Sequence, residues 1–315
     1  MKVSIVEKLV GLIRDTSSSL PEDVEKALKG AARKEAKGGS AAVILKTIVD
    51  NVKLARRQGT PLCQDTGTLT FFVDESLRRK VTPAVIKRAV ARATELGYLR
   101  KNCIDSVTGR SYDDNCAEGA PVVHYVVSRE PEQPKHPNTQ TPRHRGSVTL
   151  VMKGGGSENM SRQYSLPDAA LGAGRDLAGV RKCVLDAVQK TQGYGCAPGI
   201  LGVCIGGDRA TGYEVAKEQL LRPLDEDRLN SGFSDCLTAC EKSGKLKSSN
   251  QGIKLSALER KLLREANSLG IGPMGLGGKT TLLGVKLAAR PRVPASFFVT
   301  VAYMCWACRR RTCEI

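Results

Sequence analysis

Cysteine thiols are the side chains in this sequence with the clearest potential for chemistry. The chain has 11 cysteines, an odd number without the tight, regular spacing of a disulfide framework. We expect most of them to be reduced residues of the core. Cys63, Cys196 and Cys305 differ, because each lies beside turn-forming or small polar residues, in PLCQDTGT, GYGCAPG and MCWACRR. They are too far apart in sequence for a local metal-binding loop, so only the fold could bring their thiols together.

Two overlapping glycine-rich motifs are similar to nucleotide-binding loops. GIGPMG, at residues 270–275, matches the dinucleotide pattern G-x-G-x-x-G, but that pattern needs a preceding strand and a helix is predicted there instead. PMGLGGKT comes close to a phosphate-binding loop, with Pro273 in place of the first glycine. We therefore interpret this segment either as a tight turn or as a flexible wall of a small-anion site.

Cys305 and Cys308 have the C-x-x-C spacing of a zinc half-site or a redox pair. A zinc site would need a second pair or matching histidines, whereas Cys236 and Cys240 lie in a polar insertion and the chain has only 3 histidines. A thioredoxin-type motif should open a helix after a first strand, and this one lies near the C-terminus. Neither chemistry is favoured.

The elements that must position these residues follow from apolar periodicity. Helical spacing predicts helices over residues 1–15, 24–31, 42–52, 83–96, 176–192, 211–221 and 255–269. Runs of β-favouring residues predict strands over 69–73, 147–152, 282–288 and 295–303, with a sharp turn at Gly154 and Gly155. Polar insertions are predicted at 129–146 and 225–252. The length would allow about two domains, but single domains often run longer, so the domain count stays open at this point.

Composition limits the functional classes. The chain has 315 residues, 41% hydrophobic and 26% charged, as expected for a folded protein with a core. Its net charge of +17 favours anionic partners, but the basic residues are dispersed and only 4% of residues are aromatic, so nucleic-acid binding is not favoured. The sequence has neither an apolar run of about 18 residues nor a signal peptide, so we expect a cytoplasmic protein with no membrane partner.

Seven segments carry a resemblance to a known family. They are GTPLCQDTGTLTFFV, VVHY, KGGGSENMS, CAPGILGVCIGGDR, LLRPLDE, NSLGIGPMGLGGKTTLLGVK and CWACRRR. Together they resemble the α subunit, or N-terminal domain, of iron–sulfur class I fumarases and L(+)-tartrate dehydratases. The resemblance extends from about residue 4 to residue 311. It implies the fold of that N-terminal domain, one α+β domain spanning 1–315 that is rich in helices and has a small mixed sheet.

The resemblance implies a [4Fe-4S] cluster held by Cys63, Cys196 and Cys305. With three protein ligands, the fourth iron is left open for substrate. An open iron acts as a Lewis acid that binds a substrate carboxylate and hydroxyl and stabilises the departing or incoming hydroxide. This family cofactor suits thiolates supplied by three separate segments.

The resemblance also implies a set of substrate-site residues. Asp65 matches a family acidic residue with a part in proton transfer. Gln64 is expected to hydrogen-bond the substrate, and Arg100 to bind a substrate carboxylate with two parallel hydrogen bonds, or else to form a surface salt bridge. The backbone groups of Gly154 and Gly155 are expected to line the cavity, where a side chain would collide with substrate or cluster.

Several positions depart from the family pattern. Ala197 follows Cys196 where the family has proline, and residues 115–121 read NCAEGAP in place of N-T-G-D-N-T-P. Val293 stands where a substrate-contacting histidine is expected. His124 falls at a family histidine position inside an apolar strand, which is equally consistent with a core histidine. These changes leave the cluster ligands intact and put the usual substrate preference in question.

The sequence therefore predicts the α subunit of a hydro-lyase that adds water to fumarate to form malate. An L(+)-tartrate dehydratase α subunit, forming oxaloacetate, is the alternative within the family. A non-catalytic iron–sulfur or anion-binding homologue is a third reading. Since the chain stops at Ile315, soon after the last cluster motif, we also expect a β subunit that supplies further substrate-binding residues.

Overall fold

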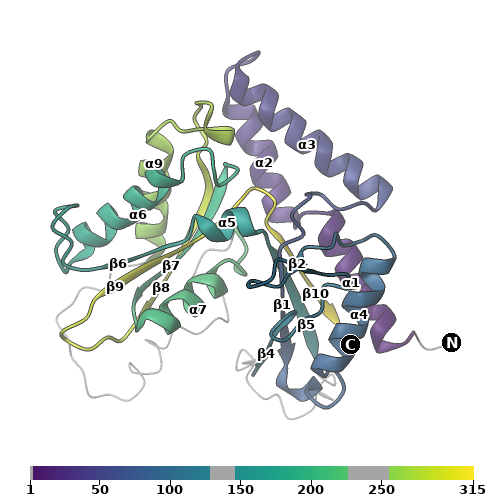
Figure 1. Ribbon diagram of the computed structural model, residues 1–315. Helices are drawn as coiled ribbons and strands as arrows, with labels where there is room; N and C mark the ends of the chain where they lie inside the picture. The colour runs from purple at the N-terminus through teal and green to yellow at the C-terminus, as the bar shows by residue number, and fades with distance from the viewer. Residues whose placement is uncertain (1–2, 128–145, 226–254) are drawn as a thin grey trace, which may run out of the picture. The chain divides into compact units, whose positions relative to one another are not determined.

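The computed structural model describes residues 3–127, 146–225 and 255–315 (Figure 1). The chain divides into two compact units that exchange segments along the sequence. The first comprises Met1–Pro21, Asn51–Lys153 and Arg309–Ile315, and the second comprises Glu22–Asp50 and Gly154–Cys308. Apart from Gly146 and Asp225, the two predicted polar insertions lie outside the described residues.

A four-stranded mixed sheet forms the centre of the first unit. Its strands, in spatial order, are β10 (Arg309–Glu314), β5 (Ser147–Lys153), β1 (Thr68–Asp74) and β4 (Val122–Val126). β1 runs parallel to β4 and antiparallel to β5, and β10 pairs antiparallel with the other edge of β5. The last strand in the sequence is thereby placed beside β5 in the first unit.

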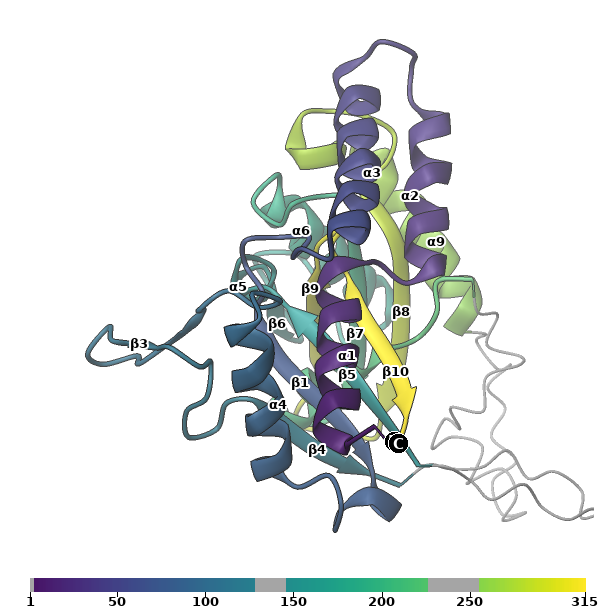
Figure 2. The same cartoon turned by 90° about the vertical axis from the view of Figure 1, so that its right-hand side faces the viewer.

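Helices α1 (Ile5–Ser18) and α4 (Pro83–Glu95) pack with this sheet around one apolar core, and run beside it in Figure 2. Ile13, Phe71 and Ile86 are fully buried there. Each helix starts at a side-chain cap: Ser4 accepts from the Glu7 amide, and Thr82 accepts from the Val85 amide just before Pro83. The unit also contains the 3₁₀ turn η1 (Glu75–Leu77) and the short hairpin β2 (Cys103–Ile104) and β3 (Ser111–Tyr112).

The second unit is built on another four-stranded mixed sheet. Its spatial order is β6 (Arg162–Ser165), β9 (Phe298–Met304), β7 (Gly199–Gly206) and β8 (Leu282–Arg290). β7 is parallel to β8 and antiparallel to β9, and all of its residues are buried. A strand covered on both faces needs apolar or very small residues throughout, which the sequence GILGVCIG provides.

Helices cover both faces of β7. Leu201 and Val203 belong to the core formed with α6 (Leu177–Thr191) and α9 (Leu255–Ser268). Because side chains alternate along a strand, Gly202 points the other way, where the backbone of α7 (Arg209–Gln219) packs against it. The unit is completed by α2 (Glu22–Lys34), α5 (Gly155–Asn159), η2 (Pro273–Gly275) and the first part of α3 (Ser40–Gln58).

The predicted α+β class is confirmed, and each helix and strand predicted within the described residues is present. Three details differ. The described residues contain two four-stranded mixed sheets, not one small sheet. The glycine run at 154–156 does not form a simple turn but begins α5. β2, β3, β6, β7 and β10 were not predicted. β2, β3 and β6 are short, β7 contains three glycines, and β10 begins with three arginines that indicate a solvated charge run. No helix in the described part of the chain is long and apolar enough to cross a membrane.

Candidate active site

Cys63, Gln64 and Asp65 lie together on the loop that joins α3 to β1, in the first unit. Two hydrogen bonds anchor the start of this loop at Leu62: its amide donates to the Ser17 carbonyl at 2.9 Å, and its carbonyl accepts from Asn51 Nδ2 at 3.2 Å. Cys63 and Asp65 are half-buried, and Gln64 is exposed. The loop thus holds the predicted ligand and the predicted acid–base residue beside each other.

Asp65 is contacted from two directions within this unit. Asn102 Nδ2 donates to its side-chain oxygen Oδ1 at 3.3 Å. Its backbone carbonyl accepts from Arg309 Nη2 at 2.8 Å. The carboxylate and the peptide of the predicted catalytic residue therefore have separate supports.

Arg309 is a deeply buried cation, with 1% of its surface exposed. Beyond the bond to Asp65, its Nε and Nη1 atoms are buried without a hydrogen-bond partner in the described structure. Burying guanidinium N–H groups in this way is costly, and such groups usually have a structural or functional reason. Arg309 therefore places a buried positive charge next to the backbone carbonyl of Asp65.

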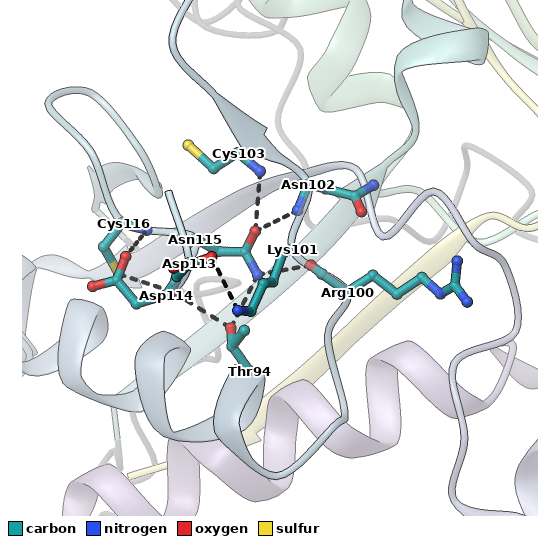
Figure 3. A network of polar contacts seen from close by, with 9 residues as sticks. All are labelled: Thr94, Arg100, Lys101, Asn102, Cys103, Asp113, Asp114, Asn115 and Cys116. Carbon is teal, nitrogen blue, oxygen red and sulfur yellow. Dashed lines mark hydrogen bonds and ion pairs between the residues drawn. The ribbon is translucent and has the colours of Figure 1, made fainter. Parts of the chain in front are cut away.

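Arg100 starts a segment whose backbone is held by a single amide side chain (Figure 3). Asn115 Oδ1 accepts from the amides of Asn102 and Cys103, at 2.7 and 3.1 Å. Asn115 Nδ2 donates to the Arg100 carbonyl at 2.8 Å and to Thr94 Oγ1 at 3.0 Å. The Arg100 side chain is exposed, and Figure 3 shows it extending away from this network.

His124 lies in β4 and stacks on Phe72 of β1, with ring centroids 5.2 Å apart and an interplanar angle of 18°. The two residues are direct neighbours in the β1–β4 register. This contact accounts for an imidazole at a half-buried strand position.

Cys196 and Cys305 both belong to the second unit and lie on adjoining segments. The Trp306 amide donates to the Cys196 carbonyl at 3.3 Å, which links the residue after Cys305 to Cys196 itself. Cys196 has a φ of 51°, in the left-handed region that non-glycine residues seldom adopt. Cys196 is exposed, and Cys305 is half-buried. An unusual backbone conformation at a predicted ligand is typical of functional positions.

The Tyr303 ring packs closely against the segment that carries Cys196. It is 2% exposed, and a Cβ atom added at Gly195 or Gly199 would overlap its ring. The glycines on either side of Cys196 are therefore required by the close approach of this ring. Burial raises the pKa of the Tyr303 phenol, and negative charge on Cys305 and Cys196 raises it further, so the hydroxyl stays protonated.

Gly154 and Gly155 also lie in the second unit, at the start of α5. Gly154 is buried and its carbonyl accepts from the Glu158 amide at 3.0 Å and from Ser157 Oγ at 2.9 Å. Gly155 is exposed. Val293, at the position where a histidine was expected, is 64% exposed in the connection between β8 and β9.

The glycine-rich segment after α9 has its own internal anion. The Lys279 amide donates to both carboxylate oxygens of Glu35, each at 3.0 Å. The Glu35 carboxylate thus accepts the hydrogen bonds of a backbone amide that would donate to phosphate in a nucleotide-binding loop. This contact, together with the helix that precedes GIGPMG, favours the structural turn over a nucleotide or small-anion site.

The structure therefore groups the predicted residues in two sets. The first unit holds Cys63, Gln64, Asp65 and Arg100, and the second holds Cys196, Cys305, Gly154 and Gly155. Within residues 3–127, 146–225 and 255–315, no three Cys, His, Asp or Glu side chains gather into a group that could hold a metal ion. The available donors are thiols, the ligands that iron–sulfur clusters require.

Sequence reasoning missed four residues of these two sets: Asn102, Asn115, Tyr303 and Arg309. Asn115 opens the altered NCAEGAP run, which was the available signal. Arg309 lies in the CWACRRR segment, but its run of arginines indicates a solvated charge run. Asn102 and Tyr303 have no local signature, because their roles depend on contacts with distant parts of the chain.

Comparison with known proteins gives a match over almost the whole chain. The family model described as fumarate hydratase (Fumerase) matches residues 6–314. A protein from Geobacillus stearothermophilus, assigned as a class I fumarate hydratase, is 43% identical over 311 residues, covering 97% of this chain and 54% of the relative. The chain thus spans about half the length of that relative.

Two further relatives match along most of their own length. A Methanocaldococcus jannaschii protein assigned as an L(+)-tartrate dehydratase α subunit is 32% identical, covering 98% of this chain and 96% of the relative. The L(+)-tartrate dehydratase α subunit of Escherichia coli K12 is 27% identical, covering 99% of this chain and 92% of the relative.

Proposed function

This chain belongs to the fumarate hydratase (Fumerase) family, and from that premise we propose that it is the cluster-binding part of a hydro-lyase that reversibly hydrates fumarate to malate. The observation that carries the proposal is the family match over residues 6–314, supported by 43% identity to the Geobacillus protein. The placement of Asp65 beside Cys63 on one anchored loop fits that chemistry.

Cys63, Cys196 and Cys305 would hold a [4Fe-4S] cluster. Support comes from the donor type, from the adjoining segments that carry Cys196 and Cys305, and from the unusual backbone at Cys196. When bound, the cluster supplies a Lewis-acidic iron for the substrate oxygens. The buried Tyr303 ring packs against Gly195 and Gly199, which flank Cys196, and so supports the segment that carries this proposed ligand.

The protein groups bind and orient the dicarboxylate and move the proton. Arg100 is exposed on a fixed backbone and would bind one carboxylate of the substrate with two parallel N–H donors. Gln64, exposed next to Cys63, would donate a hydrogen bond to the same substrate. The Asp65 carboxylate would take part in the transfer of the proton that accompanies addition or loss of water. The backbone of Gly154 and Gly155 would leave space where a larger residue would collide with the substrate.

A β subunit would complete the substrate site. Relatives named as α subunits match this chain over 92–96% of their length, which favours a protein of the two-chain type. Reduced thiols suit the reducing environment of the cytoplasm, which we propose as the location of the protein.

L(+)-tartrate dehydration to oxaloacetate is the second candidate. The relatives that share the full length of this chain carry that name. The exposed Val293, in place of a histidine, is a specific reason to test a substrate other than fumarate.

Anaerobic reconstitution with iron and sulfide tests both candidates. We expect about four irons per chain and an electron paramagnetic resonance (EPR) signal of the reduced cluster that shifts when fumarate or malate is added. A shift with tartrate alone would replace fumarate with the second candidate. A full cluster whose EPR signal responds to none of these dicarboxylates would indicate a non-catalytic iron–sulfur homologue. If no cluster forms either with or without a β subunit, the proposal of a [4Fe-4S] cofactor is wrong.

A further inference from the structure

Asn115 has the geometry of a residue that sets the position of others. It is buried, with 7% of its surface exposed, and has a φ of 60°. Asparagine tolerates this left-handed conformation better than most residues other than glycine. Its own amide donates to the Tyr112 carbonyl at 3.1 Å, so the turn that follows β3 places the side chain inward.

All four hydrogen bonds of the Asn115 side chain have ordinary lengths of 2.7 to 3.1 Å. Three of them go to the backbone of the segment from Arg100 to Cys103, and one goes to α4 through Thr94. A buried amide that uses both its oxygen and its nitrogen in this way fixes the backbone, since removing the side chain takes a hydrogen-bond partner from each of these part-buried groups. Figure 3 shows Asn115 in the middle of this network.

The fixed segment reaches the loop of Cys63 at two points. Thr66 Oγ1 donates to the Arg100 carbonyl at 3.4 Å, the same carbonyl that Asn115 Nδ2 contacts. Asn102 Nδ2 donates to Asp65 Oδ1 at 3.3 Å. Asn115 thereby holds the backbone of both Arg100 and Asn102, and the side-chain amide of Asn102 donates to the carboxylate of Asp65.

We propose that Asn115 is a positioning residue of the dicarboxylate site, which holds Arg100 directly and orients Asp65 through Asn102. This inference rests on the proposed function, because it takes Arg100 and Asp65 as the groups that meet the substrate. Asn115 touches neither substrate nor cluster; it acts through the segment it holds. A small displacement of a binding group is enough to lower affinity strongly, so loss of the network should affect binding more than folding.

The main variant is Asn115→Gly, which keeps a residue suited to a φ of 60° and removes all four side-chain bonds. Hydrogen–deuterium exchange on the full chain should show lost protection at the amides of Asn102 and Cys103. In the reconstituted chain, we expect an unchanged iron count and a rise of about tenfold or more in the fumarate concentration that half-saturates the EPR shift.

Asn267→Ala is the matched control. Asn267, on α9 in the second unit, also bridges two backbone amides, accepting from Thr281 and Leu282 at 2.8 Å each. Both Asn267→Ala and Asn115→Gly should lower the midpoint temperature of thermal unfolding, because each removes a network of side-chain hydrogen bonds. In Asn267→Ala, however, the fumarate concentration that half-saturates the EPR shift should stay within about twofold of the wild-type value.

Asn102→Ala gives an independent test that does not depend on the folding of the Asn115 variant, since Asn102 is exposed. With the holoenzyme, we expect turnover to fall while KM for fumarate stays near the wild-type value, because Asn102 orients Asp65 and does not hold the substrate. Wild-type turnover in this variant would remove Asn102 and its contact with Asp65 from the proposal.

Three outcomes would overturn the inference while the proposed function stands. The first is lost exchange protection in Asn115→Gly with unchanged fumarate affinity, which would mean a purely structural role. The second is an equal loss of affinity in Asn267→Ala. The third is loss of iron from Asn115→Gly. If the wild-type chain itself gives no fumarate-dependent signal, the proposed function fails, and the inference fails with it.

Discussion

Burial divides the cysteine thiols of this chain into different chemical classes. Burial raises the pKa of Cys183 to about 12 and that of Cys204 to about 11. The pKa of Cys116 also rises to about 11, through burial and then the negative charge of Asp114. Since a raised pKa keeps the proton on sulfur, these thiols remain neutral well above physiological pH. Cys196, in contrast, is exposed.

Thiol alkylation of the cluster-free chain should follow this division. At pH 8, we expect iodoacetamide to modify Cys196 first and to leave Cys183 and Cys204 unmodified until the protein unfolds. Peptide mass spectrometry at successive times measures the order. Equal rates for Cys196 and Cys204 at pH 8 would contradict the expectation.

Asp65→Asn should keep the cluster and reduce turnover by about a hundredfold or more, as expected for a residue that transfers a proton. The change keeps an oxygen that can accept from Asn102, so the loop should stay in place. Iron content and initial rates of fumarate hydration are the measurements. Asp105→Asn is the control: Asp105 accepts from the Thr108 amide in a surface turn of the same unit and should have no effect on the rate. A wild-type rate in Asp65→Asn would exclude proton transfer by this residue.

At the scale of the elements, β10 shows where sequence reasoning fails. Periodicity predicted α4, α6, α7 and α9 well, because each has one apolar stripe that the core requires. Three consecutive arginines have no apolar stripe, and yet they open a strand that pairs with β5. The burial of Arg309 depends on its register opposite Met152 and on its bond to Asp65, which are both distant in sequence.

The predicted site residues show the same limit. Motif resemblance located Cys63, Asp65 and Arg100, since these lie in recognisable local runs. Resemblance marked the NCAEGAP run that Asn115 opens but assigned that residue no role, and it did not find Asn102 or Tyr303, because each of the three acts through a contact with a different segment. A supporting residue becomes visible only when the fold shows what it supports.

The fit between Tyr303 and β7 gives a stability prediction for these elements. Gly199→Ala should lower the free energy of unfolding by about 1–3 kcal/mol, because the added methyl group would overlap the buried ring. Chemical denaturation measures the change. Gly11→Ala, in the middle of α1 with no atom near the added Cβ, should instead be neutral or stabilise by up to about 1 kcal/mol. Equal effects of the two changes would mean that the ring can move aside.

At the scale of the whole molecule, the proposed ligands come from both compact units: Cys63 from the first, and Cys196 and Cys305 from the second. Composition and periodicity could not have predicted which segments of the chain join each unit, because neither indicates which distant strands pair.

Serine substitution tests this ligand set. Cys63→Ser, Cys196→Ser and Cys305→Ser should each abolish a stable cluster after reconstitution, because serine is a poor replacement for a thiolate ligand of iron. Iron and sulfide content are the measurements. Cys236→Ser and Cys240→Ser, in the second polar insertion outside the described residues, should retain the cluster. Similar losses at all five positions would contradict the assignment of ligands.

The position of β10 also has a consequence for the order in which the protein can fold during synthesis. The sheet of the first unit is mostly encoded before residue 154, yet its β10 edge is made from residues 309–314, which leave the ribosome after the whole second unit. Until then β5 has an open edge and Asp65 lacks its contact with Arg309. Nascent chains should therefore expose the unpaired edge of β5 while the second unit is being synthesised, and exposed strand edges of this kind favour pairing errors.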